Sequence, residues 1–322
     1  MKILLRSAVL ILLCFGLLSI PAYAAGELIP VGEVIGLELR DGTVTVEGFD
    51  PELGKPCKDA GLQAGDVIKR INGSAVRSCD DLRHGLERSD GAVTLTVDRT
   101  GQTLTFKIAP HITAEGPKLG LYLRQGVTGI GTVTWYDPDT GKFGALGHGV
   151  SNGSGKLVTM TEGWAYSARV LTVKKGRSGT PGQLMGAIRD PKPIGALTGN
   201  TPQGVFCKTE KGWSGTEMSV AESNEVHAGP ATILSTVQDG QTREYSVEIL
   251  KIYPQARQSG RNLLIHVTDP ALLEITGGIV QGMSGSPILQ DGKLVGAVTH
   301  VLVNDPTTGY GIFIENMLNA AA

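Results

Sequence analysis

A serine near the carboxyl end of the chain lies in a setting that suits nucleophilic chemistry. Ser284 belongs to the run 282–287, which reads Gly-Met-Ser-Gly-Ser-Pro. A nucleophilic serine needs its own backbone amide and a neighbouring amide directed at one spot, where the negative oxygen of a tetrahedral intermediate forms. Glycine two positions before the serine and one position after it allows such a turn without a clash at Cβ. The run therefore predicts Ser284 as nucleophile and the amides of Gly282 and Ser284 as the oxyanion hole.

The segment after this serine strengthens the prediction. Pro287–Leu289 reads as a strand, 291–293 as a turn, Leu294–Val303 as a long strand, Tyr310–Ile314 as a further strand and 314–321 as a helix. This order resembles the tail of chymotrypsin-like proteases after their nucleophile. Two alternatives stay open: a glycine turn in an ordinary β protein, and Ser286 as nucleophile, although its place before a proline suits packing better.

A serine hydroxyl is hardly ionised at neutral pH, so it needs a base, and an imidazole is the usual one. The six candidates are His84, His111, His148, His227, His266 and His300. His148 lies in the small-residue run 144–150 at the end of a predicted strand, more than a hundred residues before the serine, and we predict it as the base. His300 follows the serine on a strand that would border the cleft, which favours substrate contact, whereas His84 belongs to a predicted helix. A structural histidine is the alternative for His148.

The residue that orients the base is harder to choose, because one carboxylate resembles another. Asp269 follows a predicted strand over 262–267 and opens the approach to the serine loop. Asp137, Asp139 and Asp190 also stand beside prolines in turns, and a simple turn cap is the alternative for Asp269. Asp269 is the candidate for the third member of the site.

The first part of the chain reads as a small α+β module. Short strands are predicted at 43–46, 67–71, 93–97 and 104–108, with a helix over 80–89. The central string, from Ala60 to Gly73, places Ala-Gly-Leu before Gly-Asp and Ile-Asn-Gly. In these motifs the module, about residues 30–110, resembles a PDZ domain.

A PDZ domain binds an extended peptide as an added strand beside a helix, and the amides of a glycine-containing loop hold the terminal carboxylate. The resemblance implies that Ile35, Gly36 and Leu37 form this loop and that the helix over 80–89 flanks the peptide. The loop departs from the commonest Gly-Leu-Gly-Phe form. A structural spacer is the alternative function of the module.

The rest of the chain favours a barrel or paired barrels, because glycine-punctuated strands follow Pro110 with little helix before Ile314. A turn cluster at 137–141 predicts a hairpin between 131–136 and 142–146. We therefore expect a mainly β chain: a signal peptide at 1–24, a PDZ-like domain at 25–110, and a chymotrypsin-like double β-barrel peptidase domain at 111–322.

The charge of the chain excludes nucleic acid as a partner. The formal net charge is −2, and removal of Lys2 and Arg6 with the signal segment takes 29 basic residues to 27 against 31 acidic ones, near −4. Such a chain has no electrostatic footprint for nucleic acid.

The first residues resemble an export signal. They combine basic residues, an apolar run from Ala8 to Ile20, and the small-x-small string Ala22-Tyr23-Ala24. This pattern predicts export with cleavage before Ala25, with an uncleaved anchor as the alternative.

The cysteines outside the signal segment are Cys57, Cys79 and Cys207, an odd number that predicts no disulfide framework, although a Cys57–Cys79 bridge is possible. No metal-ligand spacing is present, and we expect neither a metal nor another cofactor.

Several landmarks together point to one family. They are the export segment, the PDZ-like module, Gly147-His148-Gly149, Thr268-Asp269-Pro270, and the strings 277–287 and 296–301. Over nearly the whole chain they resemble the stage IV sporulation protein B peptidases of endospore-forming bacteria. The resemblance implies His148, Asp269 and Ser284 as base, orienting acid and nucleophile. It also implies a signalling protease, active between forespore and mother cell, that cuts a membrane-held regulator of sigma-factor processing and cuts itself near its N-terminus.

Two other functions compete with this one. The chain could be a catalytically silent PDZ adaptor, although candidates for all three catalytic residues are present. It could also be a general quality-control protease of the envelope, but in proteases of that kind the PDZ domain follows the barrels, whereas here it precedes them.

Overall fold

A computed structural model describes residues 26–153, 155–255 and 260–322. The predicted signal peptide therefore lies outside the described residues. Within the described part, none of the helices has the length and apolar run that a membrane span requires.

The chain is mainly β, as predicted, and its elements follow one another in this order. They are β1 Ile29–Pro30, β2 Val34–Phe49, α2 Lys55–Asp59, β3 Val67–Ile71, β4 Ser74–Ala75, α3 Cys79–Glu87, β5 Val93–Arg99, β6 Gln102–Ile108, β7 His111–Thr113, β8 Gly116–Lys118, β9 Leu121–Tyr136, β10 Lys142–Ala145, β11 Glu162–Lys174, β12 Gln183–Thr201, β13 Gly204–Lys208, β14 Gly229–Ser235, β15 Arg243–Ile252, β16 Leu263–Val267, α4 Pro270–Thr276, β17 Pro287–Gln290, β18 Lys293–Leu302, β19 Asp305–Phe313 and α5 Ile314–Ala321.

Six strands form the first barrel. Along the large sheet the order runs β9-β10-β13-β12-β11-β2, and β9 also pairs with β2, which brings the path back to its start. Apolar side chains that alternate along these strands fill the interior, among them Val133, Phe143 and Val205, each 0% exposed. Burial of such side chains is the main stabilising contribution to the barrel.

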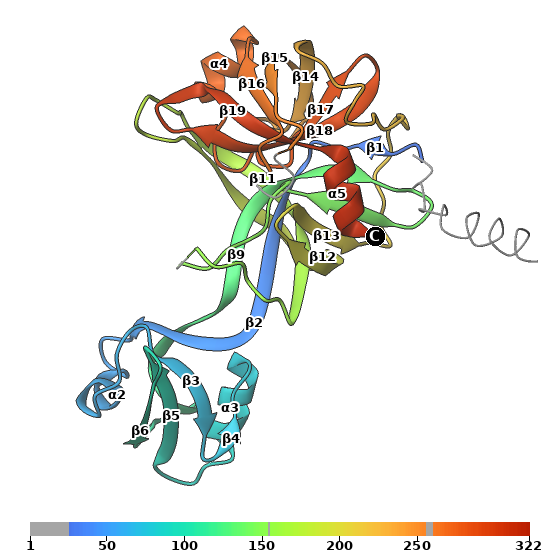
Figure 1. The fold of residues 1–322 in the computed structure, drawn as a ribbon. Helices are drawn as coiled ribbons and strands as arrows, with labels where there is room; N and C mark the ends of the chain where they lie inside the picture. The colour runs from blue at the N-terminus through green and yellow to red at the C-terminus, as the bar shows by residue number, and fades with distance from the viewer. Residues whose placement is uncertain (1–25, 154, 256–259) are drawn as a thin grey trace, which may run out of the picture.

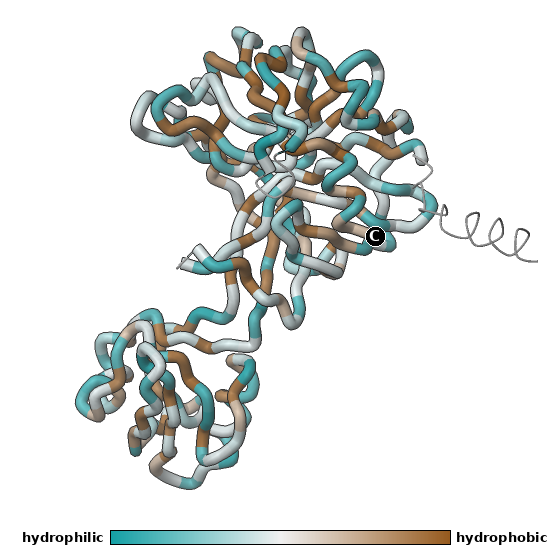
Figure 2. The backbone as a smooth tube through the Cα atoms, viewed as in Figure 1, coloured by the Kyte–Doolittle hydropathy of each residue, from teal (hydrophilic) through white to brown (hydrophobic). Residues whose placement is uncertain are grey.

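The second barrel closes in the order β14-β15-β16-β19-β18-β17. Its interior holds Ile233, Ile265 and Val298, all 0% exposed. Gly296 allows the wall to close tightly, because a Cβ there would lie 2.2 Å from the carbonyl oxygen of Ile312. The predicted double barrel is confirmed, and hydrophobic segments follow its strands while many outlying turns are hydrophilic (Figure 2).

The PDZ-like module hangs below the two barrels on a ribbon of two long strands, β2 and β9 (Figure 1). These strands run antiparallel from Val34↔Thr132 in the first barrel to Phe49↔Leu121 in the module. The module's core contains Leu119 and, partly buried, Leu121 and Leu123. The module thus extends past Pro110, whereas the first half of β2 belongs to the barrel.

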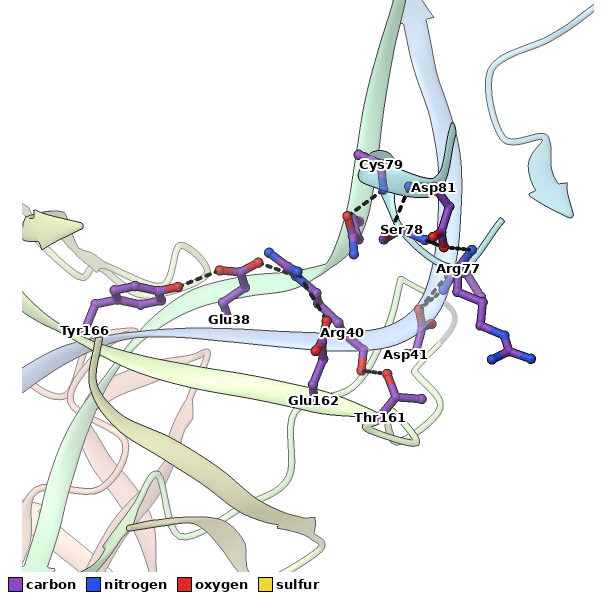
Figure 3. A network of polar contacts seen from close by, with 12 residues as sticks. Glu38, Arg40, Asp41, Arg77, Ser78, Cys79, Asp81, Thr161, Glu162 and Tyr166 are labelled. Carbon is purple, nitrogen blue, oxygen red and sulfur yellow. Dashed lines mark hydrogen bonds and ion pairs between the residues drawn. The ribbon is translucent and has the colours of Figure 1, made fainter. Parts of the chain in front are cut away.

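Polar contacts join β2 to β11 at the place where the ribbon leaves the first barrel (Figure 3). Arg40 on β2 donates to Glu38 at 2.7 Å and to Glu162 on β11 at 3.2 Å. The Tyr166 hydroxyl on β11 donates to Glu38 at 3.0 Å, and the Arg40 guanidinium lies 4.6 Å from the ring centroid of Trp164. These contacts fix β2 to β11 as far as Arg40.

The structure places Ile35–Leu37 elsewhere than expected. They lie inside β2, with β9 on one side and β11 on the other, and Ile35 and Leu37 are 1% and 4% exposed. Their backbone groups serve the two ladders, so they form a buried strand of the barrel and no carboxylate-binding loop. The three cysteines outside the first 25 residues are free thiols.

Candidate active site

The predicted nucleophile lies at the wall of a cleft between the barrels. Ser284 precedes β17 and is half-buried, and its hydroxyl donates to the carbonyl oxygen of Thr299 on β18 at 2.8 Å. Ser286 points the other way: it is fully buried, and its hydroxyl donates to Ser235 at 3.1 Å. Ser284 is thus the serine of this run that faces the cleft.

The amides predicted as the oxyanion hole are both free to receive a ligand oxygen. The carbonyl of Gln281 accepts from Leu184 N at 2.8 Å, and that of Met283 accepts from Ser286 N at 2.9 Å. In a trans peptide the N–H points opposite to the C=O, so these contacts fix the directions of the Gly282 and Ser284 amides. Neither amide donates to any group of the described residues.

Glycine at both ends of the serine turn has a steric cause. Gly282 and Gly285 have φ of 99° and 98°, in the left-handed region. A Cβ at position 285 would lie 2.0 Å from the Thr132 carbonyl oxygen and 2.6 Å from Leu146 N. The close approach of β9 therefore requires glycine after the nucleophile.

Thr132 on β9 holds the nucleophile loop from the first barrel, a role that no local sequence pattern indicates. Its N–H donates to Ser284 O at 3.0 Å, its hydroxyl donates to Gly282 O at 2.8 Å, and its carbonyl accepts from Leu146 N at 3.2 Å. One buried threonine thus joins the serine loop to the strand end that leads to His148.

His148 follows β10 and enters the same cleft. Ser284, His148 and His300 all line this space, whose volume is about 470 Å³. Nδ1 of His148 lies 3.0 Å from the carbonyl oxygen of Gly149. Burial lowers the pKa of His148, so the imidazole is neutral at neutral pH and can accept a proton.

His300 stands beside His148, with 5.2 Å between the ring centroids. Burial, the neighbouring His148 and Arg261 lower the pKa of His300 to about 4. Its Nδ1 is buried and has no hydrogen-bond partner among the described residues. A neutral ring in the cleft, next to the base, suits the substrate contact predicted for His300.

Asn200 supports the segment that follows His148, and no local sequence pattern indicates this role either. Its side-chain oxygen accepts from Val150 N at 2.8 Å, and its Nδ2 donates to Val150 O at 2.9 Å and to Val158 O at 3.0 Å. These bonds fix the backbone behind the histidine while leaving the imidazole itself untouched.

The structure does not join Asp269 to His148. One carboxylate oxygen of Asp269 accepts from Ala271 N and Leu272 N at 2.9 and 3.0 Å, and the other accepts from Ser246 N at 3.3 Å. Among the described residues, no hydrogen bond or ion pair links it to the imidazole. Asp269 is the N-cap of α4, with Pro270 at the first helical position, which is the cap that an Asp-Pro pair favours.

A second groove lies in the PDZ-like module, between α3 and the start of β9. It has a volume of about 410 Å³, and Leu82 and Leu86 of α3 face Leu121 and Leu123 across it. The segment 118–120, Lys-Leu-Gly, lies at one end, where Gly120 has φ of 62°. This placement beside a helix and a strand, and not at Ile35–Leu37, is the one in which an added peptide strand fits.

Comparison with known proteins agrees with these two parts. Residues 115–318, more than half of the chain, match the family described as SpoIVB peptidase S55, and residues 34–109 match the PDZ domain. A search of curated proteins found no match.

Among the solved structures that match are proteases, at low identity and with TM-scores below 0.5. The inactive form of the Rv3671c protease, a protein of M. tuberculosis, is 13% identical with a TM-score of 0.34, over 60% of this chain and 82% of that one. The HtrA-type protease AlgW with a decapeptide is 12% identical with a TM-score of 0.38, over 70% of this chain and 54% of that one. Because the family match covers more than half of the chain, the chain belongs to the SpoIVB peptidase S55 family and is a serine endopeptidase with a PDZ domain on its N-terminal side.

Proposed function

We propose that this endopeptidase is an exported signalling protease of sporulation that cuts a membrane-held regulator of sigma-factor processing, and also itself. One observation carries the catalytic part of the proposal: Ser284 and His148 line a single cleft beside two amides that donate to no described group. Membership of the SpoIVB family supports the signalling role in the space between forespore and mother cell, and the apolar run before Ala25 supports export across the cytoplasmic membrane.

In the proposed reaction the Ser284 hydroxyl turns from the Thr299 carbonyl toward His148, which takes its proton as the oxygen attacks the substrate carbonyl. The amides of Gly282 and Ser284 hold the resulting oxyanion, and His148 returns the proton to the leaving amine. A His148 imidazole that is neutral at neutral pH suits this role.

We place self-cleavage before Leu28. Leu28 N donates to Met218 O at 3.0 Å, and Ile29 and Pro30 pair with Tyr136 and Trp135 in β9. A cut within this paired segment would require the strand to leave the sheet, whereas a cut nearer to Ala25 would not.

The test uses purified protein that starts at Ala25, with Ser284→Ala as its control. We expect diisopropyl fluorophosphate to label the first protein alone, and intact mass to show a slow self-cut that the variant lacks. Equal masses and no labelling in both would leave a silent adaptor. Equal rates on unfolded casein and on the ectodomain of a membrane-held sporulation regulator would favour general proteolysis.

A further inference from the structure

Strand β9 offers an open backbone edge that leads from the PDZ groove to the catalytic serine. One edge of β9 pairs with β2 from Leu121 to Thr132. The other edge pairs with β10, and only from Val133 onward. Among the described residues, no strand covers this second edge between positions 121 and 131.

The direction of the open backbone groups in the cleft follows from Thr132. The N–H of Thr132 donates to Ser284 O, away from β2, and backbone direction repeats every second residue of an antiparallel pair. The N–H and C=O of Ile130 and Thr128 therefore face the same side. Thr128 is exposed, and the segment 127–130 lines the cleft of Ser284.

The same reasoning applies within the PDZ module. Val46 on β2 donates its N–H to Asp66 O, away from β9, so its partner Leu123 also directs its backbone groups outward. Gln125, two residues further, does the same. The register of the ribbon then shifts at Gly126, so the outward groups form two stretches of one edge, at 123–125 and at 128–130. Leu123 lines the groove beside α3, and the side chain of Gln125 accepts from Cys79 N at the start of that helix.

Among the described strands, β2, the other strand of the ribbon, has no comparable edge. β11 pairs with β2 as far as Arg40, and β3 pairs with it again at Val44. A peptide that crosses from module to barrel as an added strand therefore has β9 as its partner.

We propose that a substrate polypeptide binds as an added strand along this edge of β9, held in the PDZ groove at one end and cut at Ser284 at the other. The proposal rests on the proposed function and specifies how that site is supplied. The occupant is an extended, unfolded segment of the substrate, because the edge offers main-chain groups that only an extended backbone can pair.

The direction of the substrate follows from the more common, antiparallel pairing. A peptide that runs antiparallel to β9 leaves Ser284 toward the module and reaches the 118–120 segment with its carboxyl end. The part that lies on β9 is thus the C-terminal side of the cleaved bond. Seven residues separate Leu123 from Ile130, about 23 Å at 3.3 Å per residue, so the cut should have about ten or more residues after it.

The first experiment measures that length. The probe is a library of peptides 10–40 residues long with free carboxyl ends, digested by the protein and by Ser284→Ala, with products identified by mass spectrometry. We expect products on the C-terminal side of the cut to be about ten residues or longer, with no such limit on the N-terminal side. Cuts close to the carboxyl end, or a limit on the N-terminal side instead, would overturn the proposal.

The second experiment removes one donor from the edge. Thr128→Pro deletes the outward N–H and keeps the ladder with β2, since an edge position tolerates proline. Its matched control is Thr103→Pro on β6, the last strand of the sheet, where the pair Arg99↔Gln102 beside a two-residue turn makes Thr103 face outward.

We expect Thr128→Pro to lower kcat/KM at least tenfold on the best library peptides and Thr103→Pro to match the parent protein. Equal kcat/KM in all three proteins would overturn the proposal while leaving the peptidase intact. A parent protein that neither reacts with diisopropyl fluorophosphate nor cuts any peptide would overturn the proposed function itself. The product lengths of the parent protein decide the proposal even where Thr128→Pro fails to fold.

Discussion

The loop of the nucleophile and the loop of the histidine face each other across one cleft, but they are held in different ways. Thr132 on β9, Leu184 on β12 and Val298 on β18 each bond the backbone of the segment 281–285. The imidazole of His148, by contrast, has only the carbonyl of its neighbour Gly149 as a hydrogen-bond partner among the described residues. Three strands therefore hold the loop that carries Ser284. The segment after His148 is held by Asn200, and no described residue from another strand bonds the imidazole itself.

The difference shows where the catalytic geometry resides. The amides of Gly282 and Ser284 donate to no described group, and their loop is held by three strands, so the loop is positioned before substrate binds. The Ser284 hydroxyl bonds Thr299, and among the described residues no hydrogen bond joins it to His148, so contact with His148 requires a rotation of the Ser284 side chain. A serine loop that is held in place and a Ser284 hydroxyl that must rotate to reach the base together predict the following effects.

The largest effect should come from the two side chains that react. Ser284→Ala and His148→Ala should each lower kcat by a factor of about 10⁴ or more, measured on a library peptide. Ser286→Ala is the matched control, because its hydroxyl lies in the core and bonds Ser235. It should keep kcat and lose about 1 kcal/mol in the free energy of unfolding. A normal rate in Ser284→Ala would move the nucleophile to another residue.

A smaller effect on kcat should follow when the serine loop loses its hydrogen bond to the Thr132 hydroxyl. Thr132→Val removes the hydroxyl that bonds Gly282 O and leaves a partly buried carbonyl unpaired, at a cost of about 1 kcal/mol. Where the loop relaxes to recover a partner, the oxyanion amides turn, so kcat should fall about tenfold or more with KM little changed. Thr132→Ser keeps the hydroxyl and should retain most of kcat. Equal kcat in both variants would show that packing alone positions the loop.

Asp269 tests the histidine side. Because its carboxylate caps α4, Asp269→Ala should lower the free energy of unfolding by about 1 kcal/mol, and Asp269→Asn, a cap of similar quality, should change it little. Neither variant should alter kcat by more than a few-fold. A loss of several powers of ten in Asp269→Asn, with unfolding unchanged, would instead place this carboxylate next to His148 during turnover.

The residues that the sequence could predict are those whose role is visible in their neighbours. Glycines at 282 and 285 indicate the strained turn around Ser284, and the small residues around His148 indicate an open approach. Most strands and the helix α3 also follow from alternation and capping residues, and α3 does begin with a capping box at Ser78.

The remaining features depend on pairing between distant segments. An Asp-Pro pair reads equally well as a catalytic acid or as a helix cap, and only the position of α4 decides which. A glycine between apolar residues at 35–37 fits both a PDZ loop and a buried strand, and its pairing with β9 and β11 settles the matter. Thr132 and Asn200 act through backbone atoms far away in the chain, which local patterns do not record.

The smallest expected effect is on the pH dependence of catalysis. Burial lowers the pKa of His148 below its ordinary value of 6.5, so the imidazole stays neutral, and able to accept a proton, at a lower pH than an exposed histidine. The acid limb of kcat/KM should therefore have its midpoint below pH 6.5, and the loss at pH 6 should be less than about fourfold, the loss expected of a base with a pKa of 6.5. His300→Gln is the control: the pKa of His300 is about 4, so this ring carries no charge over the range in question, and its removal should leave the midpoint unchanged. A midpoint at or above pH 6.5 would mean that the base is better solvated, or paired with a carboxylate, in the active state, and would bring Asp269 back as its partner.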